Sequence, residues 1–163
     1  MFFKCLFDKY RNVRSKYCLW INRLIYRDRL QLSDGVYVRK NFTIVIENNG
    51  KIKIGKNVFF NNDCSLNSIE EIEIGDDCIF GENVHIYDHN HIYSDTSIPV
   101  NNQGFTSKAI HIGNNSWIGS NVTILKGVSI GSNCVIGANC VIFKDVPDKA
   151  IVKVKQNLII TNK

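Results

Sequence analysis

The 163-residue chain lacks long apolar runs and has no pair of cysteines spaced as C-x-x-C. No apolar stretch approaches the ~18 residues that are typical of a membrane span. Near the start of the chain, Lys4, Asp8 and Lys9 interrupt the apolar core that a secretory signal peptide requires. We therefore expect a cytoplasmic protein without a membrane-spanning helix.

A basic stripe along the body of the chain is also absent. The formal net charge is +5, but residues 1–30 hold eight Lys and Arg against two acids. The rest of the chain is therefore close to neutral. Nucleic-acid-binding domains normally carry a clustered basic surface. We therefore expect no nucleic-acid partner, in spite of the basic isoelectric point.

A six-residue repeat dominates residues 36–147. Fixed short-period self-similarity indicates a solenoid. Three hexads would make one triangular coil of a parallel β-helix, with a large marker residue inside and a small residue at the corner four positions later. The two-residue step from Ile72 to Ile74 departs from this period. The markers are Ile54, Phe60 and Leu66, then Ile74, Phe80 and Ile86, and finally Ile112, Ile118, Ile124, Ile130, Ile136 and Ile142.

Four of the six cysteines occupy the small corner position of this repeat: Cys64, Cys78, Cys134 and Cys140. A buried free cysteine behaves as a small hydrophobic residue. Zinc sites built on cysteine usually contain a C-x-x-C pair, which is missing here. We therefore expect reduced, buried thiols and no structural metal.

The repeat resembles that of the hexapeptide-repeat acyltransferases. The C-terminal half is most similar to the galactoside, maltose and polysaccharide O-acetyltransferases. The resemblance implies a left-handed parallel β-helix, a handedness that the period alone does not give. It also implies acetyl transfer from acetyl-CoA to a sugar hydroxyl, in a homotrimer with each site between two subunits.

Three segments follow from the pattern. Residues 1–30 have helical spacing of apolar residues with a basic opposite face, which predicts an amphipathic helical cap that could also contact an anionic membrane. Residues 31–147 form the β-helix, with an extruded loop at 92–109 where the period breaks. A long excursion of this kind inside a repeat is usually functional. Residues 148–163 alternate apolar and basic residues and predict a final strand or capping segment.

The segment from Tyr87 to His91, YDHNH, carries the strongest chemical signal and immediately precedes the extruded loop. Histidine can accept a proton from a hydroxyl near neutral pH. A metal site is the alternative, but no third ligand of a suitable type lies nearby in the sequence. We therefore expect a general base here and no metal.

The family resemblance places its catalytic histidine on His91, which leaves His89 as a rival base two residues earlier. His89 and Tyr87 are then expected to line the acceptor site. The same register places the family's acceptor-contacting asparagine on Asn61, with Asp63 beside it.

The segment NSWIGS, which begins at Asn115, matches the family's signature after the loop. The resemblance then implies that Trp117 lies near the thioester and that Ser120 contacts coenzyme A. Ala138 and Lys144 match further coenzyme A positions.

Near the C-terminus, the stretch KVKQ from Lys153 stands where the family usually has a Gly-x-Pro-Ala-like turn, and Phe143 stands where some members have Thr. Lys153, Lys155 and Lys163 are left as possible partners for the coenzyme's phosphates.

The function that we expect is O-acetylation of a surface polysaccharide or of its lipid-linked precursor, with a sugar or glycolipid as acceptor. N-acetylation of an amino sugar would use the same base and the same acetyl donor. A non-catalytic hexapeptide-repeat scaffold protein is the alternative of a different class.

Overall fold

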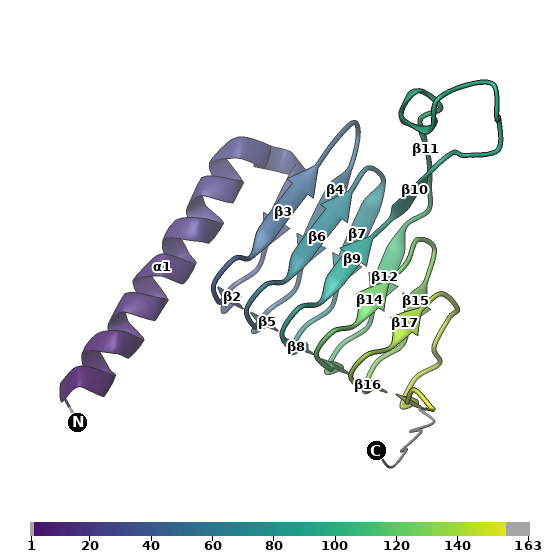
Figure 1. Cartoon of the computed structure of the whole chain (residues 1–163). Coiled ribbons are helices and arrows are strands. Elements are labelled where there is room, and N and C mark those ends of the chain that lie inside the picture. Colours follow the sequence, from purple (N-terminus) through teal and green to yellow (C-terminus); the bar gives the residue numbers. More distant parts are fainter. Residues whose placement is uncertain (1, 156–163) are drawn as a thin grey trace, which may run out of the picture.

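The computed structural model describes the backbone of residues 2–155 and the side chains of residues 9–155. A long helix, α1 (Phe2–Tyr26), leads through a short 3-10 helix, η1 (Arg27–Arg29), into a stack of triangular coils. Figure 1 shows α1 lying across one end of the stack and the C-terminal coil closing the other. The parallel β-helix predicted from the hexads is confirmed.

Three parallel sheets form the faces of the prism. Face A contains β1 (Leu30–Leu32), β4 (Lys51–Ile54), β7 (Glu71–Ile74), β12 (Ile110–Ile112) and β15 (Ser129–Ile130). Face B contains β2 (Tyr37–Val38), β5 (Phe59–Phe60), β8 (Ile79–Phe80), β13 (Trp117–Ile118), β16 (Val135–Ile136) and β18 (Ile151–Val152). Face C contains β3 (Thr43–Ile46), β6 (Ser65–Ser68), β9 (His85–Tyr87), β14 (Thr123–Ile124) and β17 (Val141–Ile142).

The hexad markers stack one above another inside this prism. Ile118 pairs with Ile136 on face B, and Ile124 pairs with Ile142 on face C, so that one coil equals three hexads. In the N-terminal coils the strands on face A are longer, and β7 buries both Ile72 and Ile74. The two-residue step in the period is therefore a second inward position on one longer strand.

Asparagine and aspartate turn most corners, a feature that the hexad analysis did not identify. Their backbones have positive φ, which Asn and Asp tolerate better than other residues with a Cβ. Their side chains also bond from coil to coil, as in the ladder from Asn83 through Asn121 to Asn139, with steps of 3.0 and 3.1 Å. The corner residues are Asn41, Asn57, Asp63, Asp77, Asn83, Asn115, Asn121, Asn133 and Asn139.

The helix α1 covers the edge of the first coil, whose backbone groups have no coil before them. The Val38 N–H donates to the Ser15 hydroxyl at 2.9 Å. The Tyr26 hydroxyl donates to the Ile44 carbonyl at 2.9 Å, and Arg23 donates to the Leu32 carbonyl at 2.5 Å. Buried backbone groups without partners are costly, so these contacts give α1 a capping role.

The opposite side of α1 is apolar and open to solvent. Val13, Tyr17, Trp20 and Leu24 are all more than half exposed and follow spacings of three and four residues. Within the part of the chain that the structure describes, no helix is both long enough and apolar enough to cross a bilayer.

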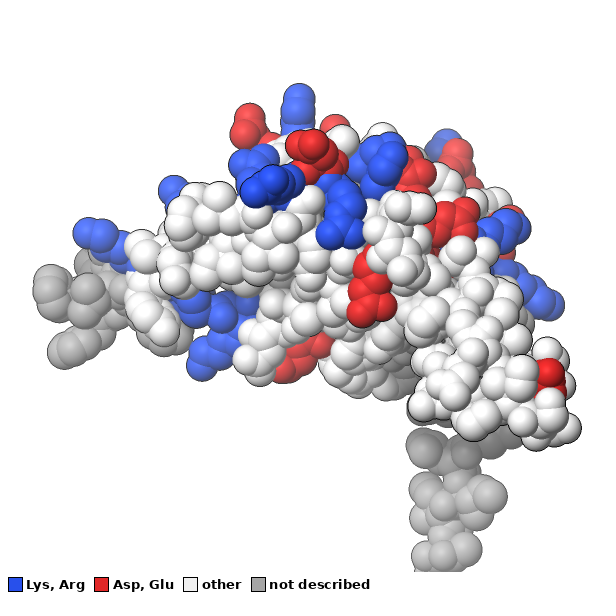
Figure 2. All heavy atoms as spheres, turned by 90° about the horizontal axis from the view of Figure 1, so that it is seen from above, with Lys and Arg blue, Asp and Glu red and all other residues white. Residues whose placement is uncertain are grey.

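The excursion begins earlier than the sequence pattern indicates. The strand β10 (His89–His91) pairs antiparallel with β11 (Phe105–Ser107), and the 3-10 helix η2 (Val100–Asn102) lies between them. His89, Asn90 and His91 therefore belong to the rising arm of a hairpin and not to the preceding hexad. The excursion forms a largely uncharged lobe in Figure 2, since Asp95 is the one charged residue between Ile92 and Ser107.

The chain after Pro147 stays on the solenoid. The strand β18 pairs in parallel with β16 and adds a last rung to face B. Residues 156–163, which include Lys163, lie outside the described residues.

Removing the cap contact of Ser15 is expected to destabilise the first coil. Ser15→Ala leaves the buried Val38 N–H without its acceptor, which should lower the free energy of unfolding by about 1–2 kcal/mol. Urea unfolding monitored by circular dichroism measures this. Asn12→Ala, at an exposed position on the same helix, is the matched control and should change stability by less than about 0.5 kcal/mol. Equal stability of the two variants would contradict the capping role.

The corner cysteines are expected to resist modification. The thiols of Cys64, Cys78 and Cys134 donate to carbonyls at 3.1–3.2 Å. Burial raises the pKa of the Cys64 thiol to about 11, so the reactive thiolate is scarce at pH 8. Maleimide labelling of the native protein at pH 8, followed by peptide mass mapping, should modify the half-buried Cys18 well before Cys64 or Cys134. Rapid labelling of the latter two would contradict the register of the coils.

Candidate active site

A buried carboxylate anchors the base of the hairpin. Asp88 is fully buried and accepts hydrogen bonds from the Ser68 hydroxyl at 2.7 Å and from the N–H groups of Ile69 and Glu70, both at 2.9 Å. Its own carbonyl accepts from the Lys108 N–H at 2.9 Å, where the chain returns to the coil. One side chain therefore ties the start of the excursion to the preceding coil. The spacing of residues in the sequence does not indicate this role for Asp88.

The two candidate histidines stand on this anchored stem in different environments. The Nδ1 atom of His89 lies 3.0 Å from Asp88 Oδ1, and its side chain is 18% exposed. His91 is exposed, with its ring 4.4 Å from that of Phe105 between centroids. Within the described part of the chain, no hydrogen bond uses the imidazole of His91. The fixed ring is therefore His89, and the ring free to meet a substrate is His91.

A hollow of about 440 Å³ surrounds these histidines. Tyr87 enters it from β9, and Leu125 enters it from the coil that follows the excursion. The structure thus brings the predicted residues Tyr87, His89 and His91 together at the edge where face C meets face A, here called the C–A edge.

Asn61 and Asp63, the other two residues predicted to contact the acceptor, lie on a different edge, where face B meets face C. Asn61 directly follows β5, and its Oδ1 atom accepts from Arg39 Nη1 at 3.0 Å and from the Asn62 N–H at 2.9 Å. Asp63 turns the same corner with φ of 62° and accepts from Asn41 Nδ2 at 2.7 Å. Neither residue lines the hollow beside His91.

Two of the predicted coenzyme A residues continue along this B–C edge. Ser120 follows β13 and Ala138 follows β16, each after a glycine. A Cβ atom on Gly119 would lie 2.7 Å from the backbone nitrogen of Ala138, so only glycine permits this close stacking. The Ser120 hydroxyl already accepts from the Glu82 N–H at 3.2 Å.

The other two residues of that set lie elsewhere. Trp117 is 56% exposed on the outer surface of face B, so it does not pack beneath the excursion, which leaves from the C–A edge. Lys144 follows β17 on the C–A edge, with its Nζ atom 5.7 Å from the centre of the Phe143 ring. One chain therefore presents the predicted site as two rows of residues, separated by face C.

The remaining histidines serve the coil. His85 bonds to Ser65 at 2.7 Å and to Asn83 at 2.9 Å, and His111 pairs with Glu73 at 3.3 Å on face A. Within residues 9–155, no cluster of three or more His, Cys, Asp or Glu side chains could hold a metal ion.

The sequence and the fold of this chain are similar to those of known transferases. The model of the bacterial transferase hexapeptide (six repeats) family matches residues 109–144. A crystal structure of a maltose O-acetyltransferase from Clostridium difficile 630 is 30% identical, with a TM-score of 0.65, and the match covers 88% of this chain and 83% of that one. The chain belongs to the hexapeptide-repeat acyltransferase family. The family assignment made from the hexads is thereby confirmed.

Two further acetyltransferases are similar over shorter spans. A galactoside acetyltransferase in complex with coenzyme A is 28% identical with a TM-score of 0.67, covering 79% of this chain and 63% of that one. WbbJ of Escherichia coli, named for O-acetyl transfer in lipopolysaccharide biosynthesis, is 31% identical over 52% of this chain. The match spans 26% of the length of a probable acetyltransferase of Mycobacterium tuberculosis, which is 31% identical, and 58% of the length of WbbJ.

Proposed function

We propose that the protein transfers an acetyl group from acetyl-CoA to a sugar hydroxyl. The observation that carries this proposal is the free imidazole of His91, held on a stem that Asp88 anchors and facing a hollow at the C–A edge. A positioned histidine within reach of a hydroxyl is what proton abstraction requires. The complex of the galactoside acetyltransferase with coenzyme A supports the choice of donor.

The assembly that we propose is a homotrimer with each site between two chains. The row containing His91 and Lys144 and the row containing Asn61, Ser120 and Ala138 lie on different edges, so that one chain alone offers two half-sites. Packing the C–A edge of one subunit against the B–C edge of the next would join them. Tyr93, Ile98 and Val100 are exposed on the nearly uncharged excursion, which suits a subunit contact.

In the proposed reaction, His91 takes the proton of the acceptor hydroxyl while the hydroxyl oxygen attacks the thioester carbonyl. Collapse of the tetrahedral intermediate breaks the C–S bond and forms the ester, and the protonated His91 returns its proton to the leaving sulfur, so that coenzyme A is released as its thiol. A backbone N–H or a hydroxyl near Ser120 would stabilise the oxyanion. The Asp88–His89 pair keeps the stem in position, and Asn61 and Asp63 orient the acceptor.

The donor would rest on the B–C edge, where glycines leave the backbone open between Ser120 and Ala138. Trp117 supplies an exposed ring for the pantetheine end. Lys144, from the C–A edge of the adjacent subunit, supplies positive charge for the phosphates. Lys153 and Lys155 are exposed after β18 and add charge at that end of the solenoid.

The acceptor that we propose belongs to a surface polysaccharide or its lipid-linked precursor. The name of the Escherichia coli relative WbbJ refers to O-acetyl transfer in lipopolysaccharide biosynthesis, which supports this choice of acceptor. The outer side of α1, with Trp20 and Tyr17 beside Lys16 and Arg23, is suited to contact with an anionic membrane surface. N-acetylation of an amino sugar would use the same base, and acceptor screening separates the two activities.

Replacing His91 tests the assignment of the base. His91→Ala should lower kcat by about 10²- to 10⁴-fold, the usual contribution of general acid–base catalysis. The affinity for acetyl-CoA, measured by calorimetry, should change little because the imidazole meets the acceptor. The assay is the release of free thiol from acetyl-CoA in the presence of a sugar panel.

His89→Ala is the matched control, and it should retain more activity than His91→Ala. An inactive His89→Ala with an active His91→Ala would move the base to the histidine that Asp88 holds. Full activity of both variants would refute general-base catalysis at this stem. No thiol release by the unmodified protein with any sugar would favour the scaffold alternative.

The oligomeric state tests the two-edge arrangement directly. Light scattering of the full chain at micromolar concentration should give a mass of about three chains, because one chain lacks a complete site. Ile98→Asp, which places a charge on the excursion, should shift the mass toward the monomer. A monomeric unmodified protein that still transfers acetyl groups would contradict the shared site.

A further inference from the structure

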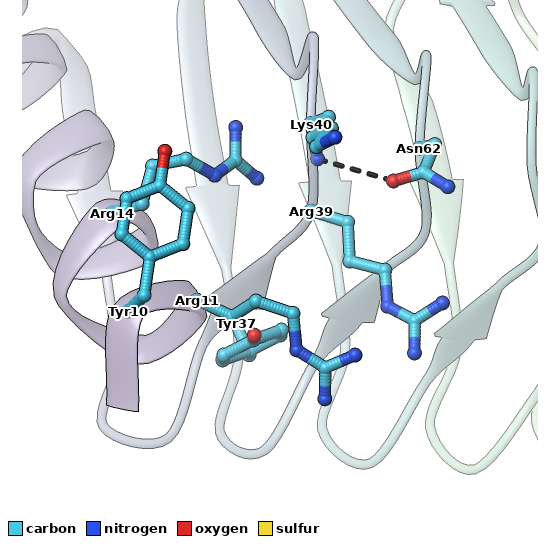
Figure 3. Close-up of a pocket in the computed structure, with 7 residues that line it drawn as sticks. All are labelled: Tyr10, Arg11, Arg14, Tyr37, Arg39, Lys40 and Asn62. Carbon is cyan, nitrogen blue, oxygen red and sulfur yellow. Dashed lines mark hydrogen bonds between the residues drawn. The ribbon is translucent and has the colours of Figure 1, made fainter. Parts of the chain in front are cut away.

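A second cavity, of about 260 Å³, lies between α1 and the first two coils. Figure 3 shows Tyr10 and Arg14 entering it from α1, and Tyr37, Arg39 and Lys40 entering it from the first coil. Arg11 also lines it from the helix. The lining therefore combines four cationic side chains with two tyrosine rings.

Three of these cationic side chains, Arg14, Arg39 and Lys40, have no carboxylate partner among the described residues that line the cavity. No Asp or Glu is among the described residues that line it. Within residues 9–155, no ion pair involves Arg14, Arg39 or Lys40. The nearest corner carboxylates are held by amides instead: Glu82 accepts from Asn62 at 2.9 Å, and Asp63 accepts from Asn41 at 2.7 Å.

The guanidinium of Arg39 is held by neighbouring residues, and one of its N–H donors has no acceptor. Its guanidinium lies 5.4 Å above the centre of the Phe59 ring, which stacks on Tyr37 at 5.8 Å. Its Nη1 atom donates to Asn61, but its buried Nε atom has no hydrogen-bond partner. A buried donor without an acceptor is uncommon and costs free energy. An acceptor supplied by a ligand would satisfy it.

The position of the cavity relates it to the acceptor and not to the donor. Lys40, Asn62, Glu82, Ser120 and Ala138 follow one another along the B–C edge, from the first coil to the last. The expected coenzyme A residues occupy the C-terminal end of this row, and the cavity occupies the N-terminal end. Asn61, the expected acceptor contact, stands between them and bonds directly to Arg39.

We infer that this cavity binds a phosphate or pyrophosphate group carried by the sugar acceptor. This inference rests on the proposed acetyl transfer and narrows its substrate class from neutral sugars to phosphorylated ones. Guanidinium groups bind phosphate through paired, charge-assisted hydrogen bonds. A single carboxylate would leave most of the charge of Arg14, Arg39 and Lys40 uncompensated, whereas a pyrophosphate offers several negative charges to these three side chains. Tyr10 and Tyr37 offer flat surfaces for a ring attached to the phosphate.

The test compares the full-length protein with Arg14→Gln, Lys40→Gln and the double variant. Both side chains line the cavity, and within residues 9–155 neither makes a hydrogen bond or an ion pair that the variants would remove. Lys56→Gln is the charge-matched control, since Lys56 is exposed after β4 and away from the B–C edge. Calorimetry with inorganic pyrophosphate should show binding to the unmodified protein and to Lys56→Gln. The double variant should bind about 10- to 100-fold more weakly, as expected for lost charge-assisted hydrogen bonds.

A transfer assay then assigns the source of the phosphate. The double variant should raise KM for a sugar 1-phosphate or a sugar nucleotide, and leave kcat and KM for the matching methyl glycoside unchanged. Equal effects on both sugars, or unweakened pyrophosphate binding, would overturn the inference. Displacement of pyrophosphate by vesicles of anionic phospholipid, but not by sugar phosphates, would assign the cavity to a lipid headgroup and overturn it too. Absence of acetyl transfer to either sugar refutes the proposed function, while the calorimetry still decides whether the cavity binds phosphate.

Discussion

Hydrogen bonding between successive coils is the constraint on which this molecule depends. Each strand satisfies its backbone groups on the coil before it and the coil after it, so that every side chain stands in register with one in the next coil. The first coil has no predecessor, and α1 supplies Ser15, Arg23 and Tyr26 in its place. The excursion leaves the coil at a corner and returns to it beside the point of departure. There the Lys108 N–H donates to the Asp88 carbonyl. The rows of site residues on two edges follow from the same register.

Much of the fold is predictable from the sequence because each coil packs only on its neighbours and repeats their inward-facing positions. A marker such as Ile118 meets Ile136 whatever the rest of the chain does, and the hexad spacing alone places both inside. The corner asparagines also recur in the sequence, since Asn121, Asn133 and Asn139 each stand three residues after a marker. The reason for this recurrence, a backbone with positive φ at each corner, is seen only in the structure. The start of the excursion was misplaced because β10 continues directly from β9, and antiparallel pairing with a distant segment leaves no periodic signal.

The candidate site is predictable only in part, for a related reason. Spacing puts Asn61, Ser120 and Ala138 on one edge once the register is known. Spacing does not say that Asp88 turns inward to meet the backbone of Ile69 and Glu70, because this contact joins residues almost one coil apart through a corner of irregular length. The bond between Arg39 and Asn61 is similar, since it requires a particular rotamer across two coils. Long-range side-chain contacts of this kind depend on packing and not on period.

The anchoring of the hairpin has a consequence for how such proteins diversify. Beneath the excursion, the chain rejoins the coil through the backbone of Lys108. The Lys108 N–H donates to the Asp88 carbonyl, and the Lys108 carbonyl accepts from the Gly127 N–H, both at 2.9 Å. The residues between the two ends carry no rung of the solenoid. Insertions, deletions or wholesale exchange of that segment can therefore accumulate without loss of foldability. A lineage built on this coil can therefore change the surface that the excursion presents beside His91 while both edges of the coil keep their register.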